Sequence, residues 1–141
     1  AQRVIQLRRV ALFASLPGET LVTIAEACEL RELTEDAQIF AAGDPPDGLY
    51  VIASGRVRIA RKGKTLVDLA PGEFFGEVAL LDDDPRMADA IATQNGVALF
   101  IGRDVFHRVT EDLPEVLRAV NRALIRYLKH TEQATGRQTV F

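Results

Sequence analysis

Cysteine and histidine are scarce in this sequence. Its 141 residues include one cysteine, Cys28, and two histidines, His107 and His130. A single cysteine excludes a disulfide within the chain, and nothing requires an oxidising compartment. Two histidines far apart in the sequence do not supply the ligand cluster of a histidine-rich metal barrel, so we expect neither a metal nor another cofactor. Cys28 falls on the apolar side of a predicted helix, which indicates a small core residue.

An excess of charge and a long apolar run are also absent. The sequence has 17 basic and 20 acidic residues, so its net charge of −3 gives no footprint for a nucleic-acid partner. No apolar run is long enough to cross a membrane, and no signal peptide is recognisable. We therefore expect a cytoplasmic location without direct membrane insertion of this segment. Hydrophobic residues make up 48% of the chain, which is enough for one domain with a substantial core.

Short strands separated by turn residues dominate the middle of the chain. The predicted strands all lie between turn signals and cover residues 30–34, 38–41, 49–53, 56–59, 65–69, 87–93 and 97–101. About eight short strands without long helices between them predict a mainly β fold and disfavour a parallel sheet. We expect an antiparallel sandwich or jelly-roll barrel (a double-stranded β-helix), flanked by N-terminal helices and a long C-terminal helix.

Three turn signals define the expected strand connections. Ser54-Gly55 should end the strand at 49–53, and Lys62-Gly63-Lys64 should form a tight turn. Gln94-Asn95-Gly96 contains the Asn-Gly pair typical of a two-residue hairpin, so a hairpin is expected there. The strand at 49–53 is nearly all apolar and should be buried on both faces, whereas residues 56–59 alternate between charged and apolar.

Helices are expected at both ends of the chain. Residues 1–10 have the pattern of the end of an amphipathic helix, and a second helix should begin between Pro17 and Thr20. Residues 104–110 fit a short helix. Asp112-Leu113-Pro114-Glu115 then offers a cap, a proline and a capping-box glutamate, which start a longer helix that runs to about Thr131.

These elements give the expected domain organisation. We predict a single domain with N-terminal helices at 1–28, a β-roll at 29–103, C-terminal helices at 104–131 and a tail at 132–141. The chain starts at an alanine in the middle of a helical pattern. This start indicates a domain excised from a longer protein, or a processed N-terminus.

Residues 74–90 have the chemistry of a phosphate cradle. Gly76 lets the backbone approach a ligand, and Glu77 to Leu81 are helix formers whose first amides lack partners inside the helix. Such amides carry partial positive charge and suit an anion. Pro85 ends the turn, and Arg86 adds a permanent charge with a planar fork of donors. Glu77 would repel a phosphate unless it accepts hydrogen bonds from a neighbouring group, such as a sugar hydroxyl.

One ordered motif resembles the cyclic nucleotide-binding domain family: Phe75-Gly76-Glu77-Val78-Ala79-Leu80-Leu81, followed after three residues by Pro85-Arg86-Met87-Ala88. The resemblance implies that Gly76 and the amides after it hold a cyclic phosphate. It also implies that Glu77 accepts the ribose 2′-hydroxyl, that Arg86 pairs with the phosphate, and that Met87 adds a backbone amide. The implied ligand-binding residues are Phe75, Gly76, Glu77, Val78, Ala79, Arg86 and Met87.

The resemblance also implies a moving C-terminal helix. In this family the last helix swings toward the pocket when ligand binds and covers the base. That motion carries the signal to an attached effector domain. The lid candidates here are the apolar residues Leu124, Tyr127 and Leu128. The implied partners are therefore a cyclic nucleotide and an effector domain in the full-length protein.

Two residues depart from the family pattern. Met87 stands where small or hydroxyl residues are common, so its long side chain could narrow the site. The missing hydroxyl favours cyclic AMP over cyclic GMP. Strand alternation puts Asp89 on the same face as Met87, where it would repel a phosphate if that face lines the pocket. One of the acids from Asp82 to Asp84 is expected to neutralise Arg86 when the site is empty.

Three functions are open at this point. The first is a regulatory module that binds a cyclic purine nucleotide, with cyclic AMP favoured over cyclic GMP, and transmits binding through its last helix. The second is a degenerate relative that keeps the fold as an interaction or structural module without nucleotide. Glu77 and Arg86 argue against it, whereas Met87 and Asp89 argue for it. The third is an enzyme, which we do not expect, because no cluster of histidines with carboxylates supplies a metal site or a base.

Overall fold

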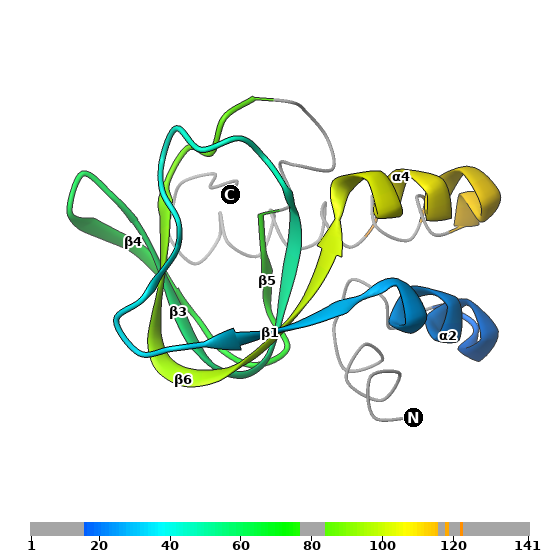
Figure 1. The fold of residues 1–141 in the computed structure, drawn as a ribbon, viewed down its shortest axis with the longest axis horizontal. Helices are drawn as coiled ribbons and strands as arrows, with labels where there is room; N and C mark the ends of the chain where they lie inside the picture. The colour runs from blue at the N-terminus through cyan, green and yellow to red at the C-terminus, as the bar shows by residue number, and fades with distance from the viewer. Residues whose placement is uncertain (1–15, 77–83, 116–117, 119–121, 123–141) are drawn as a thin grey trace.

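A curled antiparallel sheet forms the body of the domain in the computed structural model, which describes residues 16–76, 84–115, 118 and 122. The described strands follow the order β1-β6-β3-β4, with β2 paired to β6 and β5 paired to β3. Their bounds are β1 Glu29–Leu33, β2 Gln38–Phe40, β3 Gly48–Arg61, β4 Lys64–Leu69, β5 Phe74–Phe75 and β6 Asp89–Gly102. Figure 1 shows the strands wrapped into a roll, with the helices α2 (Gly18–Ala27) and α4 (Arg103–Asp112) beside it. This arrangement confirms the expected mainly β fold with flanking helices.

Two long strands, β3 and β6, form the centre of the sheet. They pair antiparallel from Gly48 opposite Gly102 to Ala60 opposite Asp89. The predicted hairpin at residues 94–96 is therefore wrong, because the residues on both sides of it pair with β3 and not with each other. The predicted end of a strand at residues 54–55 is wrong as well, because β3 continues through this point.

The two predicted turns are instead a bend that both strands share. The pairing of β3 with β6 shifts register between Ile52 and Val57. Gly55 has a φ of +87°, and a Cβ on Gly96 would lie 2.1 Å from the carbonyl oxygen of Ser54. A positive φ and so close a backbone approach both require glycine. The turn-forming residues thus bend a pair of strands at one corner, which lets the sheet curl on itself.

Other strand predictions are confirmed. Residues 49–52 are buried, and residues 56–59 alternate between half-buried and buried positions. Lys62 and Gly63 both have a positive φ and turn β3 directly into β4. Two consecutive positive φ values are typical of the tightest hairpin loop, so the sequence signal and the geometry agree here.

The buried side chains form two clusters on opposite faces of the sheet. Leu49 and Val51 of β3 belong to the cluster that the sheet shares with the helices. Tyr50 and Ile52, which alternate with them, belong to the cluster inside the roll. Because side chains alternate between the faces of a strand, one fully buried strand serves both clusters.

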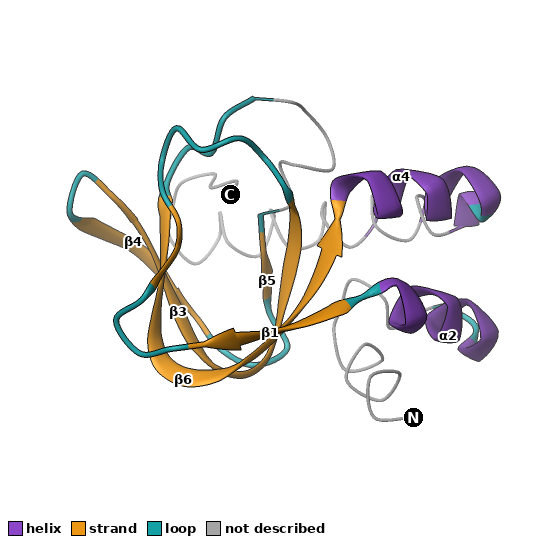
Figure 2. Cartoon of the chain, viewed as in Figure 1, coloured by secondary structure: helices purple, strands orange, loops and turns teal. Residues whose placement is uncertain are grey.

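The two helices lie beside each other next to the roll (Figure 2). α2 starts where the sequence predicts, and α4 confirms the short helix expected at 104–110. Cys28 follows α2 directly and is buried in the helix-side cluster, where its thiol donates to the carbonyl oxygen of Ile24 at 3.1 Å. Residues 1–15 and 123–131, part of the predicted terminal helices, lie outside the described residues. None of the described helices is long and apolar enough to cross a membrane.

Candidate functional site

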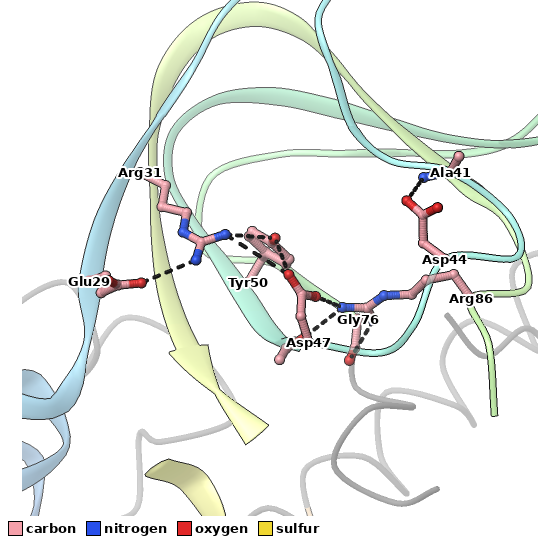
Figure 3. A network of polar contacts seen from close by, with 9 residues as sticks. Glu29, Arg31, Ala41, Asp44, Asp47, Tyr50, Gly76 and Arg86 are labelled. Carbon is pink, nitrogen blue, oxygen red and sulfur yellow. Dashed lines mark hydrogen bonds and ion pairs between the residues drawn. The ribbon is translucent and has the colours of Figure 1, made fainter. Parts of the chain in front are cut away.

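Arg86 is a charged side chain that lies buried in the wall of the roll. The residue is 4% exposed, and three protein oxygens hold its guanidinium (Figure 3). Nη1 donates to the carbonyl oxygen of Gly76 at 3.1 Å, and Nη2 donates to that of Gly48 at 2.9 Å and to Oδ1 of Asp47. These oxygens offset the cost of taking the charge out of water. Nε has no hydrogen-bond partner within the described part of the chain, so one donor of the fork is left for another acceptor.

Gly76 faces Arg86 at the end of β5. Its φ is +83°, and a Cβ at this position would lie 2.9 Å from Nη1 of Arg86 and 2.9 Å from the carbonyl oxygen of Gly48. Both the backbone conformation and the available space therefore require glycine. Phe75, the preceding residue, is fully buried and pairs with Tyr50 of β3. This pairing anchors the chain at the point where the motif begins.

Residues 41–47, which we call the strap, contact both the main chain and the side chain of Arg86. The Gly43 N–H donates to the carbonyl oxygen of Arg86, and the Arg86 N–H donates to that of Asp44, both at 2.8 Å. The Ala42 N–H donates to Oδ1 of Asp89 at 2.7 Å. The strap is thus fastened to the chain on both sides of Met87. Its last residue is Asp47, the counter-ion of Arg86.

Aromatic rings form the wall against which Arg86 lies. Its Cζ is 4.2 Å from the centroid of the Phe40 ring. Phe40 contacts Tyr50 and Phe75 at centroid distances of 6.0 and 5.9 Å, and Tyr50 stacks on Phe75 at 4.9 Å. The quadrupole of a ring attracts a cation above its face. The rings therefore restrict the position of the guanidinium in addition to burying it.

Asp47 connects the buried arginine to a second arginine, Arg31 of β1. While Oδ1 accepts from Arg86, Oδ2 accepts from the Tyr50 hydroxyl at 3.2 Å and lies 4.0 Å from Nη1 of Arg31. The same Nη1 donates to the Tyr50 hydroxyl at 3.2 Å. Burial, followed by the nearby charge of Asp47, raises the pKa of Tyr50 to about 12. The hydroxyl therefore stays a donor to Asp47 at neutral pH.

The structure brings together three of the predicted ligand-binding residues: Phe75, Gly76 and Arg86. Met87 follows Arg86 but is 48% exposed. The remaining predicted site residues and the lid candidates lie outside the described residues; these are Glu77, Val78, Ala79, Leu124, Tyr127 and Leu128.

The prediction that Met87 and Asp89 share a face rested on an expected strand at 87–93. β6 begins only at Asp89, so strand alternation does not govern the position of Met87. Asp89 is half-buried, and its carboxylate accepts the N–H of Ala42 in the strap. This hydrogen bond fixes the carboxylate of Asp89 against the backbone of the strap.

The counter-ion of Arg86 that the structure shows is not one of the three acids that the sequence indicated. Within the described residues it is Asp47, whereas Asp84 is exposed and Asp82 and Asp83 lie outside that part of the chain. Asp47 stands 39 positions before Arg86, inside a segment whose only sequence signal is that of a turn. The sequence did not indicate Arg31 either, because the pattern of its strand carries no signal for a site.

A separate hollow of about 460 Å³ lies beside Asp47 near the start of α4 and does not include Arg86. It is lined by Pro46, Asp47, Gly102, Arg103, Asp104, Val105 and Arg108. Its two arginines are accompanied by two aspartates, so its charge does not select an anion. Among the described side chains, no group of three or more histidine, cysteine or acidic residues could hold a metal ion.

Comparison with known proteins identifies the family. The model of the cyclic nucleotide-binding domain matches residues 30–112, which include Gly76, Arg86, β2 to β6 and all of β1 except Glu29. This chain belongs to the cyclic nucleotide-binding domain family. The domain is homologous to catabolite-activator-type regulators and to regulatory subunits of cAMP-dependent protein kinase.

Individual relatives agree with this assignment. An uncharacterised NTE family protein of Mycobacterium tuberculosis is 30% identical over 129 residues, which are 91% of this chain but 22% of that protein. The chain thus spans about a fifth of the length of such relatives. The N-terminal domain of a transcriptional regulator from Streptomyces coelicolor is 32% identical with a TM-score of 0.77, and the match covers 91% of this chain and 93% of that one. The regulatory domain of Toxoplasma gondii PKA, solved with cAMP, is 29% identical with a TM-score of 0.71, and covers 79% of this chain and 44% of its own.

Proposed function

We propose that this domain binds a cyclic purine nucleotide, with cyclic AMP favoured over cyclic GMP, and that it is a regulatory module and not an enzyme. The observation that carries the proposal is the buried guanidinium of Arg86, whose Nε has no partner within the described residues and which lies directly beside Gly76. A cyclic phosphate offers charged oxygen acceptors that suit such a donor. The likeness to a regulatory domain solved with cAMP supports the choice of ligand.

Each of the seven predicted ligand-binding residues has one role in this proposal. Arg86 pairs with the phosphate, and the backbone amides of Gly76, Val78, Ala79 and Met87 donate to its remaining oxygens. Glu77 accepts the ribose 2′-hydroxyl, which explains why a carboxylate is present in an anion site. Phe75 anchors the start of the motif against β3. All of these residues bind, and none of them attacks the phosphate.

The signal leaves the domain through its C-terminal end. Leu124, Tyr127 and Leu128 cover the base when the cradle is occupied, and the ligand favours the closed arrangement because it contacts both parts. An effector domain in the full-length protein receives this change. The proposed location is the cytoplasm, where cyclic nucleotides are made.

One observation favours a second candidate function. Asp47 already pairs with Nη2 of Arg86, so the charge of the guanidinium has an internal partner. In a degenerate module this pair would be permanent, and the fold would serve protein interaction or structure without nucleotide. The two candidates differ in a measurable way, because only the first binds cyclic AMP through Arg86.

Titration calorimetry with cyclic AMP and cyclic GMP tests the proposal. We expect a dissociation constant on the order of micromolar or lower for cyclic AMP and weaker binding of cyclic GMP. Arg86→Ala should weaken binding by at least about tenfold, and Arg86→Lys, which keeps the charge but loses the fork, should fall between. Arg61→Ala is the matched control, because Arg61 is exposed at the end of β3. A folded wild-type protein that binds neither nucleotide would establish the degenerate module.

A further inference from the structure

Arg31 lies outside the motif and has no role in the proposal above. Its side chain is 42% exposed, yet three contacts fix it. Its Cζ lies 3.6 Å from the centroid of the Phe100 ring, Nη1 donates to the Tyr50 hydroxyl at 3.2 Å, and Nη2 pairs with Glu29 at 3.1 Å. A stacked guanidinium at this distance is held more firmly than an ordinary surface arginine.

Asp47 lies between Arg31 and Arg86 (Figure 3). Its Oδ1 accepts from Arg86, whereas its Oδ2 faces Arg31 at 4.0 Å and accepts from Tyr50. The carboxylate is therefore shared between a buried cation and a surface cation. The electrostatic attraction between Asp47 and one of these arginines therefore depends on the position and charge of the other arginine.

An anion that approaches Arg86 meets the negative charge of Asp47 next to the guanidinium. Without a second cation, Asp47 and Arg86 form a neutral pair, and Asp47 repels the incoming phosphate. Arg31 offsets this repulsion from the far side of the carboxylate. Glu29 reduces the effect of Arg31, but its side chain is 65% exposed and lies on the side of Arg31 away from Asp47, so solvent screens it.

We propose that Arg31 is a positioning residue for nucleotide binding, which draws Asp47 toward β1 and so leaves Arg86 more available to the cyclic phosphate. This inference rests on the function proposed above. It makes Asp47 an internal competitor of the phosphate, whose strength the surface residue Arg31 sets. Affinity then depends on a residue that does not touch the ligand.

Cyclic AMP titrations at low and high salt test this role. Arg31→Gln should raise the dissociation constant about two- to fivefold at low salt and less at high salt, since half-exposed charges are screened. Arg31→Lys should restore part of the affinity, because it returns the charge without the planar stack on Phe100. Arg61→Gln removes the same charge from an exposed site outside the network and should leave the affinity unchanged.

A double-mutant cycle separates action through Asp47 from a general effect on the fold. In an Asp47→Asn background, Arg31→Gln should no longer change the dissociation constant. An equal weakening in both backgrounds, or no weakening in the native background, overturns the role of Arg31 while the proposed function stands. If Asp47→Asn does not fold in a thermal melt, the salt dependence and the lysine rescue decide the matter. A wild-type protein that does not bind cyclic AMP overturns the proposed function itself.

Discussion

Two glycines with similar φ angles differ in what surrounds them. Gly43 in the strap has a φ of +92°, and Gly76 in the cradle has a φ of +83°. A Cβ on Gly43 would meet nothing within 4 Å, whereas one on Gly76 would lie 2.9 Å from Nη1 of Arg86. Comparison of the two positions therefore separates backbone strain from steric conflict with the site.

Alanine substitution at these glycines should have unequal effects. Gly43→Ala should lower the free energy of unfolding by about 1 kcal/mol, the strain of a left-handed non-glycine residue. Gly76→Ala should cost about 1–3 kcal/mol more, because its Cβ displaces Arg86 or the Gly48 carbonyl. It should also weaken cyclic AMP binding at least about tenfold, whereas Gly43→Ala should not. Urea unfolding and calorimetry measure the two effects, and equal losses at both positions would contradict this account.

The sequence predicts those residues of the site that lie close together in the chain. Gly76 and Arg86 belong to one ordered motif, so their chemistry and spacing could be read directly. Two partners of the Arg86 side chain come from elsewhere in the chain: Asp47 is the last residue of the strap, and Gly48 is the first residue of β3. No local pattern indicates that this acid meets this arginine, since the pairing of β3 with β5 and β6 and the hydrogen bonds between the strap and Arg86 bring them together.

At the scale of elements, local turn chemistry competes with strand pairing. Asn95-Gly96 has the composition of a hairpin turn, but it lies within β6 beside the bend of β3 at Gly55. Hydrophobic periodicity indicates which face of a strand is buried, but it does not identify the partner strand. The sequence therefore predicts the fold class and the burial of residues 49–52 and 56–59 correctly, whereas two of its strand connections are wrong.

The hydrogen bond between Asp89 and the strap should contribute to the stability of the domain. Asp89→Ala removes the acceptor of the Ala42 N–H and should lower the free energy of unfolding by about 1 kcal/mol. Asp89→Asn keeps an oxygen acceptor, so its stability should change by less than about 0.5 kcal/mol. Its affinity for cyclic AMP should stay within about twofold, because the carboxylate faces the strap. Urea unfolding and calorimetry provide both values.

Asp68→Ala is the matched control for these variants, because Asp68 is an exposed acid on β4. A large gain in affinity for Asp89→Asn would show that Asp89 repels the phosphate after all. The Asp89 carboxylate would then stabilise the strap while it lowers the affinity for cyclic AMP.

At the scale of the whole molecule, Tyr50 lies where the apolar interior meets the charged network. The residue is 2% exposed and stacks on Phe75 within the roll, while its hydroxyl joins Asp47 and Arg31. A single side chain thus connects the packing of the interior with the charges around Arg86. Ionisation of its hydroxyl would affect both, which makes the pH dependence of folding a test of this connection.

Stability should fall between pH 10 and pH 12 because of Tyr50. Its pKa in the folded protein is about 12 against an ordinary value of 10.0, so in this range the unfolded chain releases a proton that the folded protein retains. The contribution is complete below pH 10 and disappears as the pH rises to 12. It amounts to at most about 3 kcal/mol, at about 1.4 kcal/mol for each pKa unit.

Tyr50→Phe should be less stable than the wild type at pH 8, since it loses two hydrogen bonds, but the two proteins should converge by pH 12. Urea unfolding at both pH values measures the difference. Titration of other groups affects both proteins alike, so curves that stay parallel would mean that the Tyr50 hydroxyl ionises as easily in the folded protein as in the unfolded chain.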